Sequence, residues 1–194
     1  MQHHLSECIA DFLLLQKIIK KQEKEIYVYG IHLIISSIVN LLICITISLL
    51  LGELINGLIF FVLFSSLRRF TGGFHCKTFL MCNVVFSLIV TLALLGNMFL
   101  GIVFENYVIL IATVIFTFLC ILLFSPVHNE NKELTYIQKK RFRILSIIVC
   151  AIHITFYVAI LILFDLRINI IVIGDLIVSL MIIFGVFNNT FMNG

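Results

Sequence analysis

His75 and Cys82 carry the side chains best suited to covalent chemistry in this sequence, and they lie seven residues apart. Imidazole is a base that titrates near neutrality, and a deprotonated thiol is a strong nucleophile. On one continuous helix the two residues would share a face but lie about 10 Å apart along the axis, too far for a hydrogen bond. A nucleophile–base pair therefore requires His75 to lie on a loop that folds back over the start of the next helix. Cys76 is a rival nucleophile, but its side chain would point away from its neighbour His75.

Two arginines and two glycines come just before this pair. Arg68 and Arg69 end an apolar run, where guanidinium groups can reach lipid headgroups, a carboxylate or a substrate backbone. Gly72 and Gly73 can adopt positive φ and allow another chain to approach closely. The same residues also fit a plainer interpretation, with the arginines as a topology signal, the glycines as a turn and the cysteine as packing. Spacing alone leaves both interpretations open.

The composition places these residues in a membrane protein. Of 194 residues, 62% are hydrophobic and 12% charged, whereas soluble domains have about 45–50% apolar and about 25% charged residues. The mean hydropathy of the chain, +1.20, is also high. The sequence therefore predicts an all-α polytopic membrane protein that forms a single membrane domain over residues 1–194. We expect it to lie in a lipid bilayer and to bind no nucleic acid.

Apolar runs and their interruptions predict about six transmembrane helices. An amphipathic helix over residues 3–25 comes first, and it either lies in the headgroup plane or packs against the rest of the protein. Residues 27–67 are long enough for two crossings with a turn at Gly52–Gly57, which leaves a second crossing that is short or re-entrant. The remaining predicted segments are a loop at 68–78, a helical hairpin at 79–124, a basic loop at 125–143 and a last hairpin at 144–187.

The basic residues predict the orientation. With six crossings and a cytoplasmic N-terminus, every lysine and arginine except Arg167 falls in a cytoplasmic segment. We therefore expect a multi-pass protein of the cell membrane whose two termini and central motif are cytoplasmic.

Two polar segments resemble a known family. Arg68-Arg69-Phe70-Thr71-Gly72-Gly73-Phe74-His75, followed by Cys82, resembles the signature of the accessory gene regulator B (AgrB) family. The segment Ser125-Pro126-Val127-His128-Asn129-Glu130-Asn131-Lys132 is similar to that family's second polar loop. The resemblance extends over nearly the whole chain.

This resemblance implies a membrane cysteine endopeptidase of Gram-positive quorum sensing. Such a protein removes the C-terminal tail of an AgrD-type propeptide and promotes its cyclisation to a thiolactone or lactone signal. By position, Cys82 would be the nucleophile and His75 the general base, with no cofactor and no metal. The residues that would shape the site or hold the acidic tail are Arg68, Arg69, Gly72, Gly73, Lys139, Lys140 and Arg141. The resemblance also implies a homodimer.

Two other classes remain as alternatives. A small-peptide exporter would use Arg68, Arg69 and Asp175 along a path, although no internal repeat is visible. A non-catalytic membrane scaffold would tolerate replacement of His75 and Cys82. Asp175 lies within an apolar run, where a carboxyl group marks either a contact between helices or subunits, or a role in substrate binding or transport. We expect His153 to form a hydrogen bond between helices.

Overall fold

The computed structural model describes residues 2–73, 79–127 and 134–192, and within these ranges the chain is helical with short connections and no strand. The elements are, in order, α1 (Gln2–Leu15), η1 (Lys21–Glu23), α2 (Lys24–Leu50), α3 (Leu54–Thr71), α4 (Phe79–Leu100), η2 (Gly101–Glu105), α5 (Tyr107–Phe124), α6 (Tyr136–Phe164) and α7 (Asn169–Met192). Six of them, α2 to α7, are long and apolar enough to cross a membrane. The prediction of an all-α polytopic membrane protein is confirmed.

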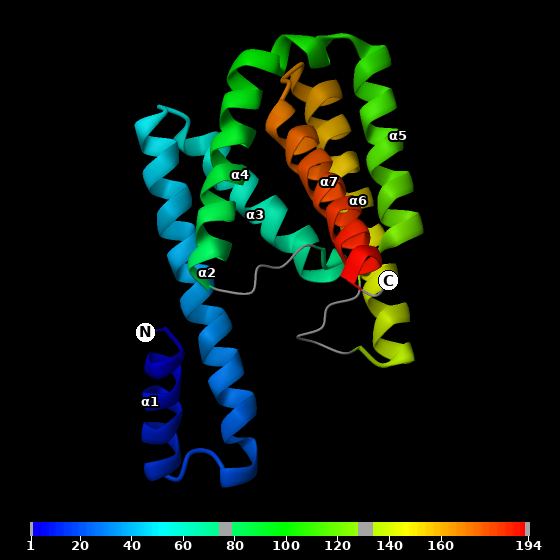
Figure 1. Cartoon of the computed structure of the whole chain (residues 1–194). Helices are drawn as coiled ribbons and strands as arrows, with labels where there is room; N and C mark the ends of the chain where they lie inside the picture. Colours follow the sequence, from blue (N-terminus) through cyan, green and yellow to red (C-terminus); the bar gives the residue numbers. More distant parts are fainter. Residues whose placement is uncertain (1, 74–78, 128–133, 193–194) are drawn as a thin grey trace.

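The six spanning helices run alternately up and down through one bundle (Figure 1). The C-terminal ends of α3 and α7 and the N-terminal ends of α4 and α6 all lie at the lower end of the bundle in Figure 1, above α1 and the start of α2. The turn between α2 and α3, the short helix η2 and the turn between α6 and α7 lie at the upper end. The segments that carry the Arg-Arg, Gly-Gly and Cys82 positions are therefore at one end of the bundle.

Helix α7 is the centre of this bundle. It contacts α3, α4, α5 and α6. In its most apolar 18-residue stretch, 56% of the residues are buried, against 28% or less in the corresponding stretch of each other spanning helix. Its fully buried residues Ile170, Val178 and Ile182 belong to the same core as Phe60 of α3 and Val90 of α4. The outer helices leave many large apolar side chains exposed, as expected of surfaces that face lipid.

The N-terminal segment differs from the predicted single helix over 3–25. Helix α1 ends at Leu15, the chain turns with Lys17 at a φ of 57°, and η1 leads into α2. Helix α1 then packs antiparallel against the lower half of α2, beyond the end of the other helices (Figure 1). Ala10 is fully buried there, and Lys24 forms an ion pair with Asp11. Helix α1 thus packs against α2, and its placement relative to the headgroup plane stays a prediction.

The second crossing is longer than the short one that we expected to follow a turn at Gly52–Gly57. The turn is confined to residues 51–53, with Gly52 at a φ of 72°, and α3 begins at Leu54. Glu53 stabilises this start, because its carbonyl accepts from the Gly57 N–H at 2.9 Å and its carboxylate accepts from the Asn56 amide. Gly57 lies inside the α2–α3 contact, where an added Cβ would overlap the Ser48 side chain. With 18 residues, α3 is about 27 Å long, close to the thickness of a hydrocarbon core.

Two predicted loops are shorter than expected because helices extend into them. Helix α3 continues to Thr71, so the Arg68–Arg69 pair lies in its last turn and not in a loop at 68–78. Helix α6 begins at Tyr136, so the basic cluster lies on a helix and not in a loop at 125–143. Thr135 and Gln138 form a capping box at this start: the Gln138 N–H donates to Thr135 Oγ1 at 3.4 Å, and the Thr135 N–H donates to Gln138 Oε1 at 3.0 Å.

Candidate functional site

The C-terminal end of α3 is a turn that only glycine fits easily. Gly72 has a φ of 66° and Gly73 a φ of 116°, both in the region that side chains disfavour. The Gly72 N–H donates to the Arg68 carbonyl at 3.3 Å and closes the last turn of the helix. A Cβ on Gly73 would overlap the Arg68 guanidinium and lie 3.2 Å from the Met181 carbonyl of α7. The two glycines therefore bring the chain out of α3 in close contact with α7.

The second polar segment packs directly against this turn. The Val127 N–H donates to the Thr71 carbonyl at 2.9 Å, and a Cβ on Gly72 would lie 2.9 Å from the Val127 carbonyl oxygen. Ser125, two residues earlier, forms a buried hydroxyl–hydroxyl contact of 2.9 Å with Ser146 of α6. The two segments that carry the family resemblance are thus in contact through Thr71 and Val127, which are 56 positions apart in the sequence.

The two arginines have different environments. Arg68 is half-buried, and its Nη1 donates to the Gly72 carbonyl, so its side chain turns back to cap the end of α3. Arg69 is exposed. A cation near the C-terminal end of a helix also interacts favourably with the helix dipole. Arg68 is therefore placed to shape the turn, whereas the guanidinium of Arg69 is accessible to a binding partner.

Cys82 lies in the first turn of α4 and is half-buried. His75, the predicted base, and Cys76, the rival nucleophile, lie outside the described residues. The structure thus places the predicted nucleophile at the end of the bundle where α3 ends, and it leaves the nucleophile–base pairing as a prediction.

The basic residues at the start of α6 divide into two groups. Lys139, Lys140 and Arg141 are exposed in its first turns. Arg143 instead donates from Nη2 to the carbonyls of Leu122 and Leu123, at 2.8 and 3.1 Å, and caps the end of α5. Between them, the Phe142 ring lies edge-on to Phe70 of α3 with the ring centroids 6.0 Å apart. The exposed cations therefore lie on a helix that is packed against the Arg68–Gly73 turn.

Sequence comparison with known proteins identifies the family of the chain. The family model for accessory gene regulator B matches residues 6–192 of the chain. The chain belongs to the AgrB family. It is 27% identical, over 73% of its length and 68% of the relative's, to an AgrB-like protein of Clostridium perfringens strain SM101. AgrB-like protein 2 of Clostridium perfringens strain 13 is 26% identical over the same shares of both chains. No solved structure matches the chain.

Membership of the AgrB family assigns this membrane protein to the peptide processing of accessory gene regulator quorum sensing. The resemblance drawn from the two polar segments is confirmed, since the match covers both of them. The Thr71–Val127 pairing, which sequence reasoning did not anticipate, joins these two AgrB segments.

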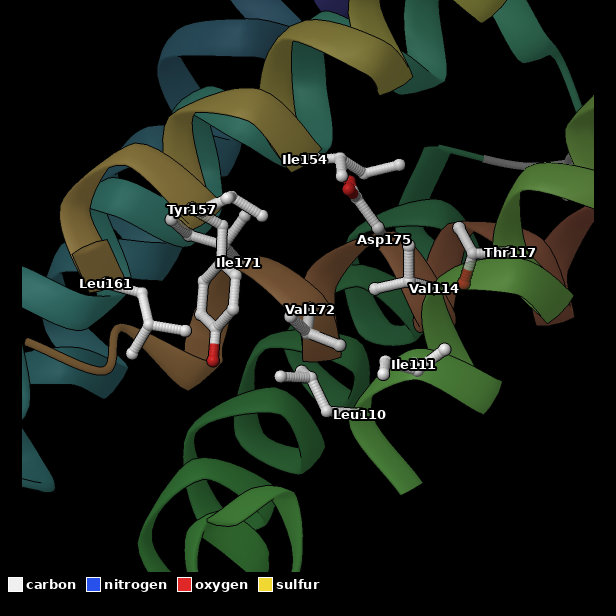
Figure 2. A pocket seen from close by; sticks show the side chains of 11 residues that line it. Leu110, Ile111, Val114, Thr117, Ile154, Tyr157, Leu161, Ile171, Val172 and Asp175 are labelled. Carbon is white, nitrogen blue, oxygen red and sulfur yellow. The ribbon is translucent and has the colours of Figure 1, made fainter. Parts of the chain in front are cut away.

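A second polar cluster of this AgrB-family chain lies inside the bundle. His153 of α6 forms a hydrogen bond to Asp175 of α7 and a second one to Ser66 of α3, which confirms the expected bond between helices. Asp175 also lines a cavity of about 150 Å³ between α5, α6 and α7, whose walls are otherwise almost entirely apolar (Figure 2). Sequence reasoning singled out Asp175 and His153 as polar groups within apolar runs, but it gave Ser66 no partner.

Proposed function

We propose that this AgrB-family chain is a membrane cysteine endopeptidase that cuts the C-terminal tail from an AgrD-type propeptide and promotes its cyclisation. The observation that carries the proposal is the family match over residues 6–192, which includes the complete Arg68–His75 signature and Cys82. The position of Cys82 near the described start of α4, at the same end of the bundle as the Arg68–Gly73 turn, supports it.

In the first step the imidazole of His75 removes the proton from Cys82 Sγ. The thiolate attacks the carbonyl carbon of the scissile peptide bond and forms a tetrahedral intermediate. As this collapses, the C–N bond breaks, and the leaving amine of the tail takes the proton from the His75 imidazolium. The products are a free tail and the remaining peptide held as a thioester on Cys82.

In the second step a thiol or hydroxyl within the bound peptide attacks the thioester carbonyl. A new thioester or ester closes the ring, and Cys82 Sγ recovers its proton through His75. Exchange of one thioester for another is nearly isoenergetic, whereas hydrolysis runs strongly downhill, so cyclisation requires a site that excludes water. A site at the membrane surface, between the ends of packed helices, meets this requirement better than an open surface does.

The exposed cations suit the tail of the substrate. Arg69, Lys139, Lys140 and Arg141 are all exposed on helix ends that pack together. An acidic tail would form charge-assisted hydrogen bonds with them and leave after cleavage. Arg68, whose Nη1 donates to Gly72, would serve mainly to shape the site.

We also propose that the site faces the cytoplasm, together with both termini, and that the protein acts as a homodimer. The orientation rests on the sequence: with six crossings, every lysine and arginine except Arg167 falls in a segment predicted to be on the same side. The homodimer rests on the family resemblance alone.

Co-expression with a candidate propeptide tests the proposal. Mass spectrometry of the released tail would compare the wild type with Cys82→Ala, His75→Ala and the matched control Cys76→Ala. We expect release to be lost in the first two variants and kept in Cys76→Ala. Release that continues in all three would contradict the endopeptidase and favour the exporter or scaffold alternatives.

A further inference from the structure

Three polar side chains form a continuous hydrogen-bonded chain across the bundle interior. Ser66 Oγ of α3 lies 3.1 Å from His153 Nε2 of α6, and His153 Nδ1 lies 2.8 Å from Asp175 Oδ1 of α7. His153 is 4% exposed and Asp175 is 5% exposed. The chain thus joins the central helix α7 to the helix that ends in the Arg68–Gly73 turn.

Ser66 links His153 to the backbone of α3. A carboxylate only accepts hydrogen bonds, so His153 donates from Nδ1 to Asp175. The Ser66 hydroxyl lies 3.1 Å from His153 Nε2 and donates its own proton to the Leu63 carbonyl at 2.8 Å, one turn back on α3.

Burial makes this arrangement specific. A carboxyl group without a partner at this depth would be costly, so Asp175 keeps His153 in place and His153 in turn keeps Ser66 in place. Figure 2 shows the Asp175 side chain reaching from α7 toward α6 beside Ile154. Displacing any one of the three groups would leave its neighbour unsatisfied in the bundle interior.

The chain lies close to the proposed site but does not include it. Ser66 is two residues before Arg68, and the α3 end beyond it is held on another side by the Thr71–Val127 bond. We propose that Ser66, His153 and Asp175 are positioning residues that fix the end of α3, and through it the Arg68–Gly73 turn, for peptide cleavage. This inference rests on the proposed endopeptidase activity, which the three residues would support without touching the substrate.

The test compares Ser66→Ala, His153→Ala and Asp175→Ala with Asp175→Asn, which keeps an oxygen that accepts from His153 Nδ1. We expect kcat for tail release to fall by about 10- to 100-fold in the three alanine variants, because small misplacements of reacting groups have effects of this size. KM should change far less, and Asp175→Asn should recover most of kcat. The double variant Ser66→Ala/Asp175→Ala should be no slower than the worse single variant, because both changes cut the same chain.

Two serines provide matched controls. Ser179 is a buried serine of α7 whose hydroxyl donates to the Asp175 backbone carbonyl within its own helix. Ser65 is the exposed neighbour of Ser66. Ser179→Ala and Ser65→Ala should leave kcat and the detergent-solubilised melting temperature close to wild type.

Several outcomes would overturn the inference. Unchanged kcat in the alanine variants would do so, as would losses of kcat that only parallel losses of melting temperature and are not rescued in Asp175→Asn. Labelling of Ser66 by a fluorophosphonate would assign it a nucleophilic role instead. If the wild type releases no tail, the proposed function fails, and alkylation of Cys82 by a small maleimide still tests the positioning: its rate should change in Asp175→Ala and not in Ser179→Ala.

Discussion

Two glycines shape the Arg68–Gly73 turn because they lack a side chain. Gly73 has no Cβ to collide with the Arg68 guanidinium, and Gly72 has none to press on the Val127 carbonyl. Both adopt positive φ, which costs other residues about 1–3 kcal/mol. The sequence predicted a glycine turn here, but the close approach of Val127 depends on tertiary structure that the motif does not encode.

Gly73→Ala should therefore impair the site. The added Cβ must displace Arg68 or move the turn away from Met181 of α7, and a shift of about 1 Å is enough to lower a rate about 100-fold. The measurement is the rate of tail release by the purified variant. Gly52→Ala is the matched control, because Gly52 also has a positive φ of 72° but an added Cβ there meets nothing within 4 Å. Equal losses in both variants would mean that backbone strain alone, and not the contact with Arg68, explains the effect.

Among the basic residues at the start of α6, Arg143 has a structural role that its neighbours do not share. All three side chains are exposed, but only Arg143 donates to two carbonyls at the end of α5, whereas Lys140 and Arg141 form no such bond among the described residues. Charge and spacing in the sequence make these residues look alike. Only the fold, which brings the α5 end beside α6, distinguishes a structural arginine from cations that are accessible to a substrate.

Arg143→Ala should lower the melting temperature of the detergent-solubilised protein, because it removes two hydrogen bonds that cap the end of α5, and such bonds contribute about 0.5–1.5 kcal/mol each. Lys140→Ala should leave the melting temperature unchanged and raise KM for a propeptide with an acidic tail. Thermal unfolding and initial-rate kinetics on both variants make the comparison. The reverse pattern, with Lys140→Ala unstable and Arg143→Ala affecting only KM, would refute the assignment.

The spanning helices were predictable, since runs of apolar residues long enough to cross a bilayer leave few alternatives. Their ends were less so. Hydropathy ends a helix at the first polar residue, yet the Thr135–Gln138 capping box and the closed turn at Gly72 carry α6 and α3 into polar sequence. The break after Leu15 was missed because periodic apolar residues continue through Ile19, which is buried although the helix has ended.

At the scale of the whole molecule, six alternating helices bring segments far apart in sequence to one end of the bundle (Figure 1). The motif itself could be found from sequence, as could its family. Its contact with the loop at Val127 and its link to Asp175 could not, because lipid-facing and buried apolar residues look alike in a chain with little amphipathic contrast. The hydropathy pattern therefore could not predict which helices are neighbours.

The proposed orientation predicts opposite accessibility at the two ends of the bundle. Cys8, Cys76 and Cys82 would be replaced by alanine, which leaves the buried Cys44, Cys120 and Cys150 as background. A cysteine at Tyr136, which is 83% exposed, should react with an impermeant maleimide only in inside-out vesicles. A cysteine at Ile102, 72% exposed in η2, should react in intact cells. Labelling of both positions from the same side would rule out the six-crossing topology.

The most direct test of the central claim is to trap the acyl-enzyme. Purified protein would be mixed with propeptide, quenched in acid within seconds and digested, and the Cys82 peptide would be examined by mass spectrometry. We expect the propeptide without its tail to be attached to Cys82, hydroxylamine to remove it, and Cys82→Ala to form no adduct. Tail release with no adduct on Cys82, or an adduct on Cys76 instead, would contradict the proposed role of Cys82.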